Sequence, residues 1–294
     1  MATIRGKQTR TAYLFLLLPL VYFSLIKVYP MVYNIYLSFH HFNMAYSWRW
    51  AGLENYKKAL SDPLFWSSVR NTVYYGFFVV LCVTVLSLLT AVGLNAKLRG
   101  RVFFRTTLFL PSVVSVVVIA TIWMWMYQPQ AGLINYVLSK LGIGPYKWLD
   151  DPNLALPSII TVTIWQQVGY NMIIFLAGLQ GIPSYLYESA RIDGAGKLAQ
   201  FWFITVPCLT PITFFVVVTT FIFTFRNFAI VYTMTQGGPL NSTNTLVYEI
   251  YRNSFQYLKG GYGAVFSVIL LLICLLFSLI SSRIARERGL GYGL

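Results

Sequence analysis

Charge is scarce in this sequence, and acidic residues are the scarcest. Charged residues make up 10% of the chain, with only 8 Asp or Glu against 22 Lys or Arg. Soluble domains carry about 25% charged residues. Because 57% of the chain is hydrophobic, too little polar surface remains to cover a monomer in water. The composition therefore excludes an ordinary soluble domain and predicts a surface that faces lipid.

Cysteine pairs and catalytic motifs are also missing. Cys82, Cys208 and Cys274 have no metal or redox spacing, and we expect all three to be small buried hydrophobic residues. The sequence contains no G-x-x-x-x-G-K-[ST], H-E-x-x-H or G-x-S-x-G motif. We therefore expect no catalytic site and no metal site, and we predict that the chain is not an enzyme.

Two polar pairs leave alternatives open. His40 and His41 are adjacent, so their side chains point in different directions on a strand or a helix. This favours an interfacial pair over a metal site. Asp150 and Asp151 precede a proline in a polar segment, where turn residues in solvent are favoured over an acid–base pair.

Long apolar runs are what the chain has in abundance. A helix needs about 20 apolar residues to cross a bilayer core about 30 Å thick, and lipid offers no partner to the backbone of an open strand. The predicted fold class is an all-α membrane protein, with a single transmembrane domain over residues 1–294. The six predicted transmembrane helices span approximately residues 11–30, 69–93, 107–127, 155–179, 209–234 and 262–282.

The net charge of +14 could suggest a nucleic-acid partner, but the basic residues form short clusters between the apolar runs. Loops rich in Lys and Arg remain in the cytoplasm. With six helices these clusters fall on one side, so both termini are predicted to be cytoplasmic. The expected surroundings are membrane lipid, and no nucleic-acid partner is expected. The clusters are Arg5, Lys7 and Arg10; Lys97, Arg99, Arg101 and Arg105; and Arg283, Arg286 and Arg288.

One cytoplasmic connection, residues 181–208, is longer than a simple turn. Ser184 is a candidate N-cap for a short helix with Glu188 early in it. Gly194 permits a sharp exit from that helix or a close approach. A short surface helix with small residues and an acid is suited to docking into a groove on a partner.

The same loop resembles the EAA loop of ABC importer permeases, with Ser189 in place of the middle alanine. The resemblance rests on the order Glu188, Ala190, Asp193, Gly194, Ala195, Phe201, Ile204, Pro207 and Pro211. Residues 52–66, 105–111, 132–142 and 234–243 resemble segments of the carbohydrate-uptake branch, the maltose and glycerol-phosphate type. The resemblance spans nearly the whole chain. It implies a type I importer permease in the bacterial or archaeal plasma (inner) membrane.

The resemblance also implies partners. A second homologous permease would form a heterodimer with this chain, and an extracytoplasmic sugar-binding protein would deliver the substrate. Two ATPase subunits would use ATP and Mg, because this chain lacks a P-loop and is expected to bind no cofactor itself. The residues that would couple to the ATPase are Glu188, Ser189, Ala190, Asp193, Gly194 and Ala195.

Polar residues inside two predicted helices suggest a substrate path. On residues 209–234 they recur at i, i+3, i+4 and i+7, which places them on one face. Amides suit the hydroxyls of a neutral polyol, but the residues alone leave open a role in hydrogen bonding between helices. The resemblance to maltose-type permeases implies the path. The path residues are Gln166, Gln167, Tyr170, Asn171, Thr220, Phe223, Thr224 and Asn227.

Arg226 is the one charge deep in the fifth predicted helix. It either reaches the outer vestibule along its aliphatic stem or forms a gate or substrate contact. Ala229 follows Phe228, where many related sugar permeases carry an acid, so that acid's role has no counterpart here.

The predicted function is uptake of a sugar or related polyol, driven by ATP hydrolysis in separate subunits. The alternative is a secondary carrier or channel for a small polar solute. Such carriers often place acids within the membrane for ion coupling, and no predicted helix interior contains one.

Overall fold

The computed structural model describes residues 2–43, 47–96 and 99–287, and most of them are helical. The chain divides into two compact units, Met1–Asp62 with Glu249–Leu271 and Pro63–Tyr248 with Leu272–Leu294. Lys97 and Arg288, two of the basic residues behind the predicted orientation, lie outside the described residues. The single permease domain over residues 1–294 stays a prediction.

Helices long and apolar enough to cross a membrane number 4 among the described residues, or up to 6 if each of two bent pairs is one span. Each predicted transmembrane segment overlaps one of these spans, so the all-α membrane fold is confirmed. The unbent spans are Tyr13–Ser38, Pro63–Asn95, Ala155–Gln180 and Gly260–Ile284. The bent pairs are Arg101–Val113 with Val116–Met126, at 103°, and Lys197–Cys208 with Thr210–Phe225, at 64°.

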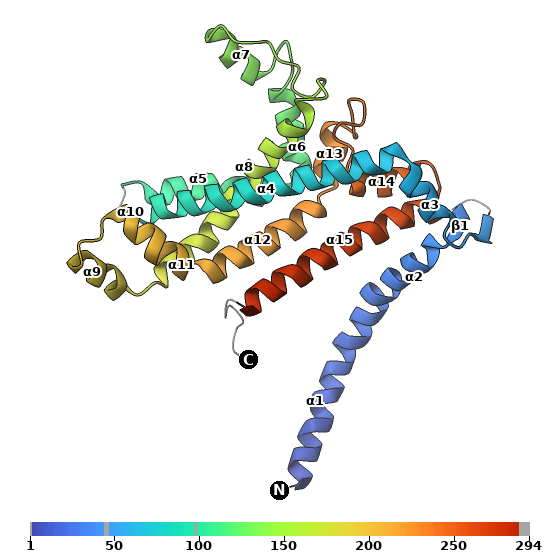
Figure 1. The fold of residues 1–294 in the computed structure, drawn as a ribbon, viewed down its shortest axis with the longest axis horizontal. Helices are drawn as coiled ribbons and strands as arrows, with labels where there is room; N and C mark the ends of the chain where they lie inside the picture. Colours follow the sequence, from blue (N-terminus) through green and yellow to red (C-terminus); the bar gives the residue numbers. More distant parts are fainter. Residues whose placement is uncertain (1, 44–46, 97–98, 288–294) are drawn as a thin grey trace. The chain divides into compact units, whose positions relative to one another are not determined.

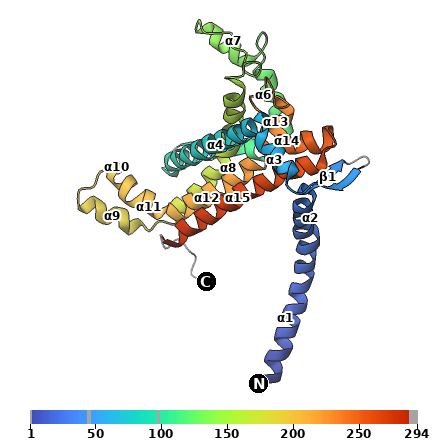
Figure 2. The same ribbon diagram turned by 45° about the vertical axis from the view of Figure 1, so that its right-hand side comes forward.

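The first unit begins with one continuous helical rod (Figures 1 and 2). It consists of α1 (Ala2–Phe23), the π-helical turn η1 (Ser24–Val28) and α2 (Tyr29–Ser38). The rod continues beyond Pro30, where the first predicted transmembrane helix was expected to end. Proline lacks the N–H of a regular helical bond, and the wider π-helical turn just before it accommodates that loss.

A small hairpin and a short helix follow the rod. Strands β1 (His40–Asn43) and β2 (Ser47–Trp50) pair antiparallel, with His40 opposite Trp50. The amide of Asn55, in α3 (Glu54–Ser61), donates to the carbonyls of Ser38 at 3.0 Å and His40 at 2.9 Å. This one side chain therefore fixes α3 against the start of the hairpin.

The two adjacent histidines point in different directions, as predicted. His40 is buried and its Nδ1 lies 2.9 Å from the carbonyl of Tyr36. His41 instead lies at the surface, with Nε2 2.9 Å from a carboxylate oxygen of Glu54.

The same unit contains η3 (Arg252–Gln256) and the first part of α15 (Gly260–Glu287). A Cβ at Gly261 would lie 1.9 Å from the carbonyl oxygen of His40. Glycine is required there because strand and helix backbones meet at van der Waals distance.

The second unit is built on two long helices, α4 (Pro63–Asn95) and α8 (Ala155–Gln180), with α5 (Arg101–Val113) and α12 (Thr210–Phe225) packed against them (Figure 1). α5 reaches α8 closely because a glycine, Gly169, stands at the contact. Buried apolar side chains fill the space between the helices. This core consists of Ala91, Leu94, Met172, Phe175, Leu176, Leu179, Leu209 and Val216.

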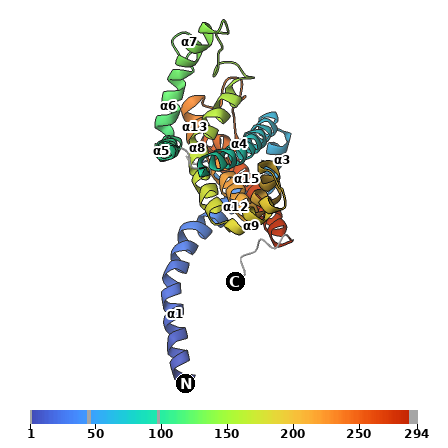
Figure 3. The same cartoon turned by 90° about the vertical axis from the view of Figure 1, so that its left-hand side faces the viewer.

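The third predicted helix is broken rather than continuous. α5 ends at Val113 and α6 (Val116–Met126) leaves at a sharp angle (Figure 3). The backbone of Val114 is extended, at φ −77 and ψ 142. Pro111 removes one N–H and crowds the preceding turn, so the last turn of α5 is weak and the helix stops soon after it. α7 (Leu133–Lys140) follows α6.

The fifth predicted helix is also interrupted. α12 ends at Phe225, residues 226–228 are unwound, and α13 (Ala229–Met234) resumes. The rest of the unit consists of the second part of α15, from Leu272, and of short elements. These are α9 (Ser184–Ile192), α10 (Lys197–Gln200), η2 (Phe201–Thr205), α11 (Val206–Cys208) and the start of α14 (Leu246–Tyr251), of which Tyr248 is the last residue in this unit.

Two predictions about isolated residues had different outcomes. Cys208 is exposed and Cys82 and Cys274 are only half-buried, so the prediction of three buried cysteines was wrong. An apolar sulfur can face outward where the surroundings are lipid. Asp151 accepts a hydrogen bond from the backbone N–H of Asn153 at 2.8 Å, which is the arrangement of a turn residue, as predicted.

Candidate functional site

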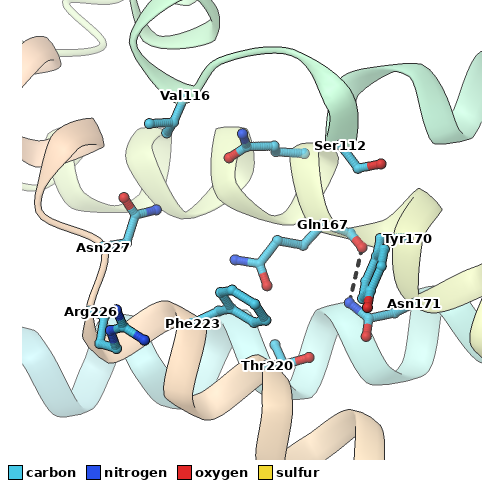
Figure 4. A pocket seen from close by; sticks show the side chains of 10 residues that line it. Ser112, Val116, Gln167, Tyr170, Asn171, Thr220, Phe223, Arg226 and Asn227 are labelled. Atoms are coloured by element: carbon cyan, nitrogen blue, oxygen red, sulfur yellow. Dashed lines mark hydrogen bonds between the residues drawn. The ribbon is translucent and has the colours of Figure 1, made fainter. Parts of the chain in front are cut away.

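A cavity of about 550 Å³ opens among α5, α6, α8 and the end of α12 in the second unit (Figure 4). Cavities that bind small molecules are typically about 300–1,000 Å³. The lining combines amides, hydroxyls, two aromatic rings and one guanidinium. Its residues are Ser112, Val116, Gln166, Gln167, Tyr170, Asn171, Thr220, Phe223, Arg226 and Asn227.

Both helix breaks border this cavity. Ser112 and Val116 flank the break between α5 and α6, and Arg226 and Asn227 lie in the unwound segment after α12. Irregular backbone at membrane depth is tolerated where it lines a cavity or is covered by protein. Transporter sites are typically built from such discontinuous helices. The two breaks therefore mark the same place as the polar lining.

Two buried side chains at the cavity carry polar atoms without a hydrogen-bond partner in the described part of the chain. These atoms are Oδ1 of Asn171 and Oγ1 of Thr220. The Asn171 amide nitrogen donates to the carbonyl of Gln167 at 3.0 Å (Figure 4). An unsatisfied buried polar group costs about 1–3 kcal/mol. A hydroxyl-bearing ligand that reached these atoms would recover part of that cost.

The unwound segment is held in place by hydrogen bonds. The N–H of Asn227 donates to the carbonyl of Thr224 at 3.2 Å, and the N–H of Phe228 donates to the carbonyl of Arg226 at 2.9 Å. The side chain of Asn227 also interacts with the Tyr75 hydroxyl of α4. The end of α12 is thus tied to a central helix of the unit.

All of the predicted path residues except Thr224 line the cavity, and so does Arg226. Thr224 is 1% exposed and turns into the protein. The prediction of one polar face was wrong in this respect, although Thr220, Phe223 and Thr224 all lie within α12. Since α12 ends at Phe225, Asn227 reaches the cavity from irregular backbone. The role of these residues as a substrate path stays a prediction.

The sequence reasoning missed Ser112 and Val116. Neither is a strong signal alone, but Pro111 lies inside an apolar helix next to them. A proline there predicts a kink, and a kink at membrane depth points to a cavity wall. The lining of the cavity could have been extended to α5 on this basis.

The segment 181–208 forms the predicted short helix, α9, and residues 197–208 are also helical: α10, η2 and α11 lead back into α12 (Figures 1 and 2). α9 ends in a Schellman motif. The N–H of Gly194 donates to the carbonyl of Arg191 at 3.1 Å, and the N–H of Ala195 donates to that of Ala190 at 2.8 Å. Gly194 has φ +81, and a Cβ built on it lies within 4 Å of no atom of the described residues. The glycine therefore provides the sharp exit, and no close approach.

The predicted helix cap was wrong. Pro183 occupies the N-cap position, with extended backbone at φ −61 and ψ 132, and Ser184 is the first helical residue. Glu188 consequently lies in the second turn, where it is exposed. A proline fixes the chain in extended geometry just before the helix, so no side-chain cap is needed to set its start.

The two faces of α9 differ. Tyr185 is 65% exposed and Ile192 is 87% exposed, and with Ser189 they share the outward face at i, i+4 and i+7. On the other face, the Tyr187 hydroxyl lies 2.9 Å from Oγ1 of Thr205, and Ala190 is half-buried. The exposed apolar residues of the outward face were not among the predicted coupling residues.

The segment 234–243 is held against α4. The amide of Asn71 donates to the carbonyls of Asn241 and Asn244, each at 3.0 Å. Gly237 has φ +82, and a Cβ there would lie 2.8 Å from the ring of Tyr248. This segment therefore has a fixed structure that depends on its glycine.

Comparison with known proteins identifies the family. Residues 83–288 match the model of the binding-protein-dependent transport system inner membrane component. The chain is 38% identical to a probable ABC transporter permease protein of Pyrococcus horikoshii, over 89% of this chain and 91% of that protein. It is 36% identical to the lactose transport system permease protein LacF of Rhizobium radiobacter, over 90% of each chain.

A solved structure shares the fold. A chain of a bacterial alginate ABC transporter, in complex with a periplasmic protein bound to an alginate pentasaccharide, superposes with a TM-score of 0.84. The superposition covers 98% of both chains at 22% sequence identity. The chain described here belongs to the family of binding-protein-dependent inner-membrane transport components, the permease subunits of ABC importers.

Proposed function

We propose that the polar cavity is the membrane path for uptake of a sugar or related polyol. The observation that carries this proposal is the gathering of amides, hydroxyls and aromatic rings at two helix breaks. Gln166, Gln167 and Asn171 can donate and accept hydrogen bonds with hydroxyls. Tyr170 and Phe223 present flat rings, which suit the C–H faces of a sugar.

The names of the relatives support the same class of substrate. The R. radiobacter relative is named for lactose transport, and the solved structure contains an alginate pentasaccharide on its periplasmic protein. We propose that this chain pairs with a second homologous permease and receives its substrate from an extracytoplasmic binding protein.

We further propose that α9 is the coupling helix. Its outward face leaves Tyr185 and Ile192 exposed, with Glu188 beside them. Apolar residues exposed together mark a surface for another protein. Two ATPase subunits would bind ATP and Mg, and their closure would move α9 and open the cavity outward. The chain described here would bind neither.

Uptake measurements test the path. Cells that express the complete importer are assayed with radiolabelled lactose, maltose and sn-glycerol 3-phosphate to find a transported compound. Gln167→Ala and Asn227→Ala should each lower its uptake, because each removes a polar contact worth about 1–3 kcal/mol when desolvated. Gln128→Ala, an exposed amide outside the cavity lining, is the matched control. Normal uptake in both cavity variants, at normal expression, would place the path elsewhere.

Cross-linking tests the coupling helix. In a cysteine-free background, Ser189→Cys should cross-link to the ATPase subunit with a yield that depends on nucleotide. Ala190→Cys should cross-link less, because Ala190 lies on the half-buried face of α9. An equal or higher yield at Ala190 would mean that the opposite face meets the ATPase.

A further inference from the structure

Arg226 gives the cavity a property that a neutral sugar does not require. It is the one charged side chain among the residues that line the cavity, and none of those residues is acidic. Ala229, one turn further on, adds no carboxylate. The salt bridges within the described part of the chain pair His41 with Glu54 and Arg252 with Glu249, so neither involves Arg226.

The position of Arg226 makes its charge accessible to a ligand in the cavity. It stands at the C-cap of α12, where the unwound segment begins, and its side chain is exposed. Figure 4 shows Arg226 and Asn227 on that segment, and both line the cavity together with Phe223. The guanidinium therefore borders the space that the amides of α8 also face.

A charged side chain at the centre of a bilayer costs several kcal/mol by any scale, so such residues typically face a water-filled cavity or pair with an opposite charge. The C-terminus of α12 offsets only a part of this, since a helix terminus typically contributes about 0.3–1 kcal/mol. The planar guanidinium matches carboxylate and phosphate in a bidentate geometry, and such charge-assisted bonds are stronger than neutral ones.

Resting on the proposed path, we propose that the substrate carries an anionic group, a carboxylate or a phosphate, that binds Arg226 while the amides of α8 hold its hydroxyls. The cavity then combines two recognition chemistries. Gln167 and Asn171 form hydrogen bonds with the hydroxyls of the polyol, and Arg226 binds its anionic group. A neutral sugar would leave the guanidinium without its counterion and would bind more weakly.

Matched probes test this assignment. The purified importer, with both permeases and both ATPase subunits in lipid nanodiscs, is titrated calorimetrically without the binding protein. The probes are lactobionate against lactitol, which differ by a carboxylate in place of a hydroxymethyl group, and sn-glycerol 3-phosphate against glycerol. We expect at least one anion to bind tenfold or more tightly than its neutral counterpart. That preference should vanish in Arg226→Gln and persist in part in Arg226→Lys.

Controls separate the possible failures. Arg70→Gln changes an exposed arginine of α4 outside the cavity lining, and it should keep the preference. Equal affinities within both probe pairs, or a preference that survives Arg226→Gln, would overturn the anionic assignment while leaving the path intact. A loss of thermal stability in unliganded Arg226→Gln, with the preference unchanged, would assign Arg226 to capping α12 or to an acid of the partner permease. Failure of every probe to bind would remove the proposed path, and the inference with it.

Discussion

Gly194 offers the sharpest test of how the loop 181–208 works. Its φ of +81 lies in the left-handed region, and a Cβ added there would meet no atom within 4 Å in the part of the chain that the structure describes. Alanine at this position should therefore fit sterically and cost only backbone strain, about 1–2 kcal/mol. About 1.4 kcal/mol changes an equilibrium constant tenfold. α9 has only 9 residues, and a helix that short is marginal by itself.

Gly194→Ala should fray the end of α9 while the membrane helices remain folded. We expect transport, and ATPase activity stimulated by the loaded binding protein, to fall by several-fold up to about tenfold. The melting temperature of the complex should change little. Gly194→Asn should recover most of the activity, because asparagine tolerates the left-handed region.

Gly196→Ala is the matched control. Gly196 lies two residues further along the same loop and has φ −70, and among the described residues no atom lies within 4 Å of a Cβ built on it. Alanine adopts that conformation without strain. Normal coupling in Gly194→Ala, or an equal defect in Gly196→Ala, would refute the argument that the Schellman ending of α9 sets coupling.

Three further predictions concern the fold. Gly169→Ala should lower the stability of the complex by about 1–3 kcal/mol through overpacking, measured by thermal unfolding. The reason is that its Cβ would lie 1.8 Å from the backbone oxygen of Leu108. Gly93→Ala should leave the stability unchanged, because a Cβ at Gly93 would lie in open space among the described residues. Asn71→Ala should also destabilise the complex, by about 1–3 kcal/mol, because it leaves two carbonyls without their donor. In a cysteine-free background, a membrane-impermeant thiol reagent should label a cysteine at Asn241 from outside and should not label one at Gly100; outside labelling at Gly100 would reverse the proposed topology.

The features that followed from the sequence are those with a local physical cause. Apolar runs of membrane-spanning length have one stable solution, a helix, so four of the predicted segments overlap unbent spans and the other two overlap bent helix pairs. Gly194 was expected to end a helix because few other residues adopt a positive φ. The position of α9 was predicted from the candidate cap at Ser184 and the glycine after the helix, although Pro183 and not Ser184 occupies the N-cap position.

The features that did not follow depend on contacts between distant segments. Residues 226–228 contain no proline or glycine, so no local signal predicts that α12 unwinds there. The ring of Phe225 occupies the space beside Gly76, where a Cβ would lie 2.1 Å away. That contact joins residues about 150 positions apart, which a reading of periodicity does not detect.

The unwound segment also explains why the polar residues around Asn227 were found while their arrangement was not. Composition alone singled them out, because polar groups inside an apolar run are costly and are retained for a reason. The directions of Arg226 and Asn227 depend on where the helix stops. Thr220 and Thr224 lie within α12, with Thr220 at the cavity and Thr224 buried away from it, whereas Arg226 and Asn227 lie beyond the helix end at Phe225. The lining of the cavity therefore combines amides from α8 with a cation from the end of α12.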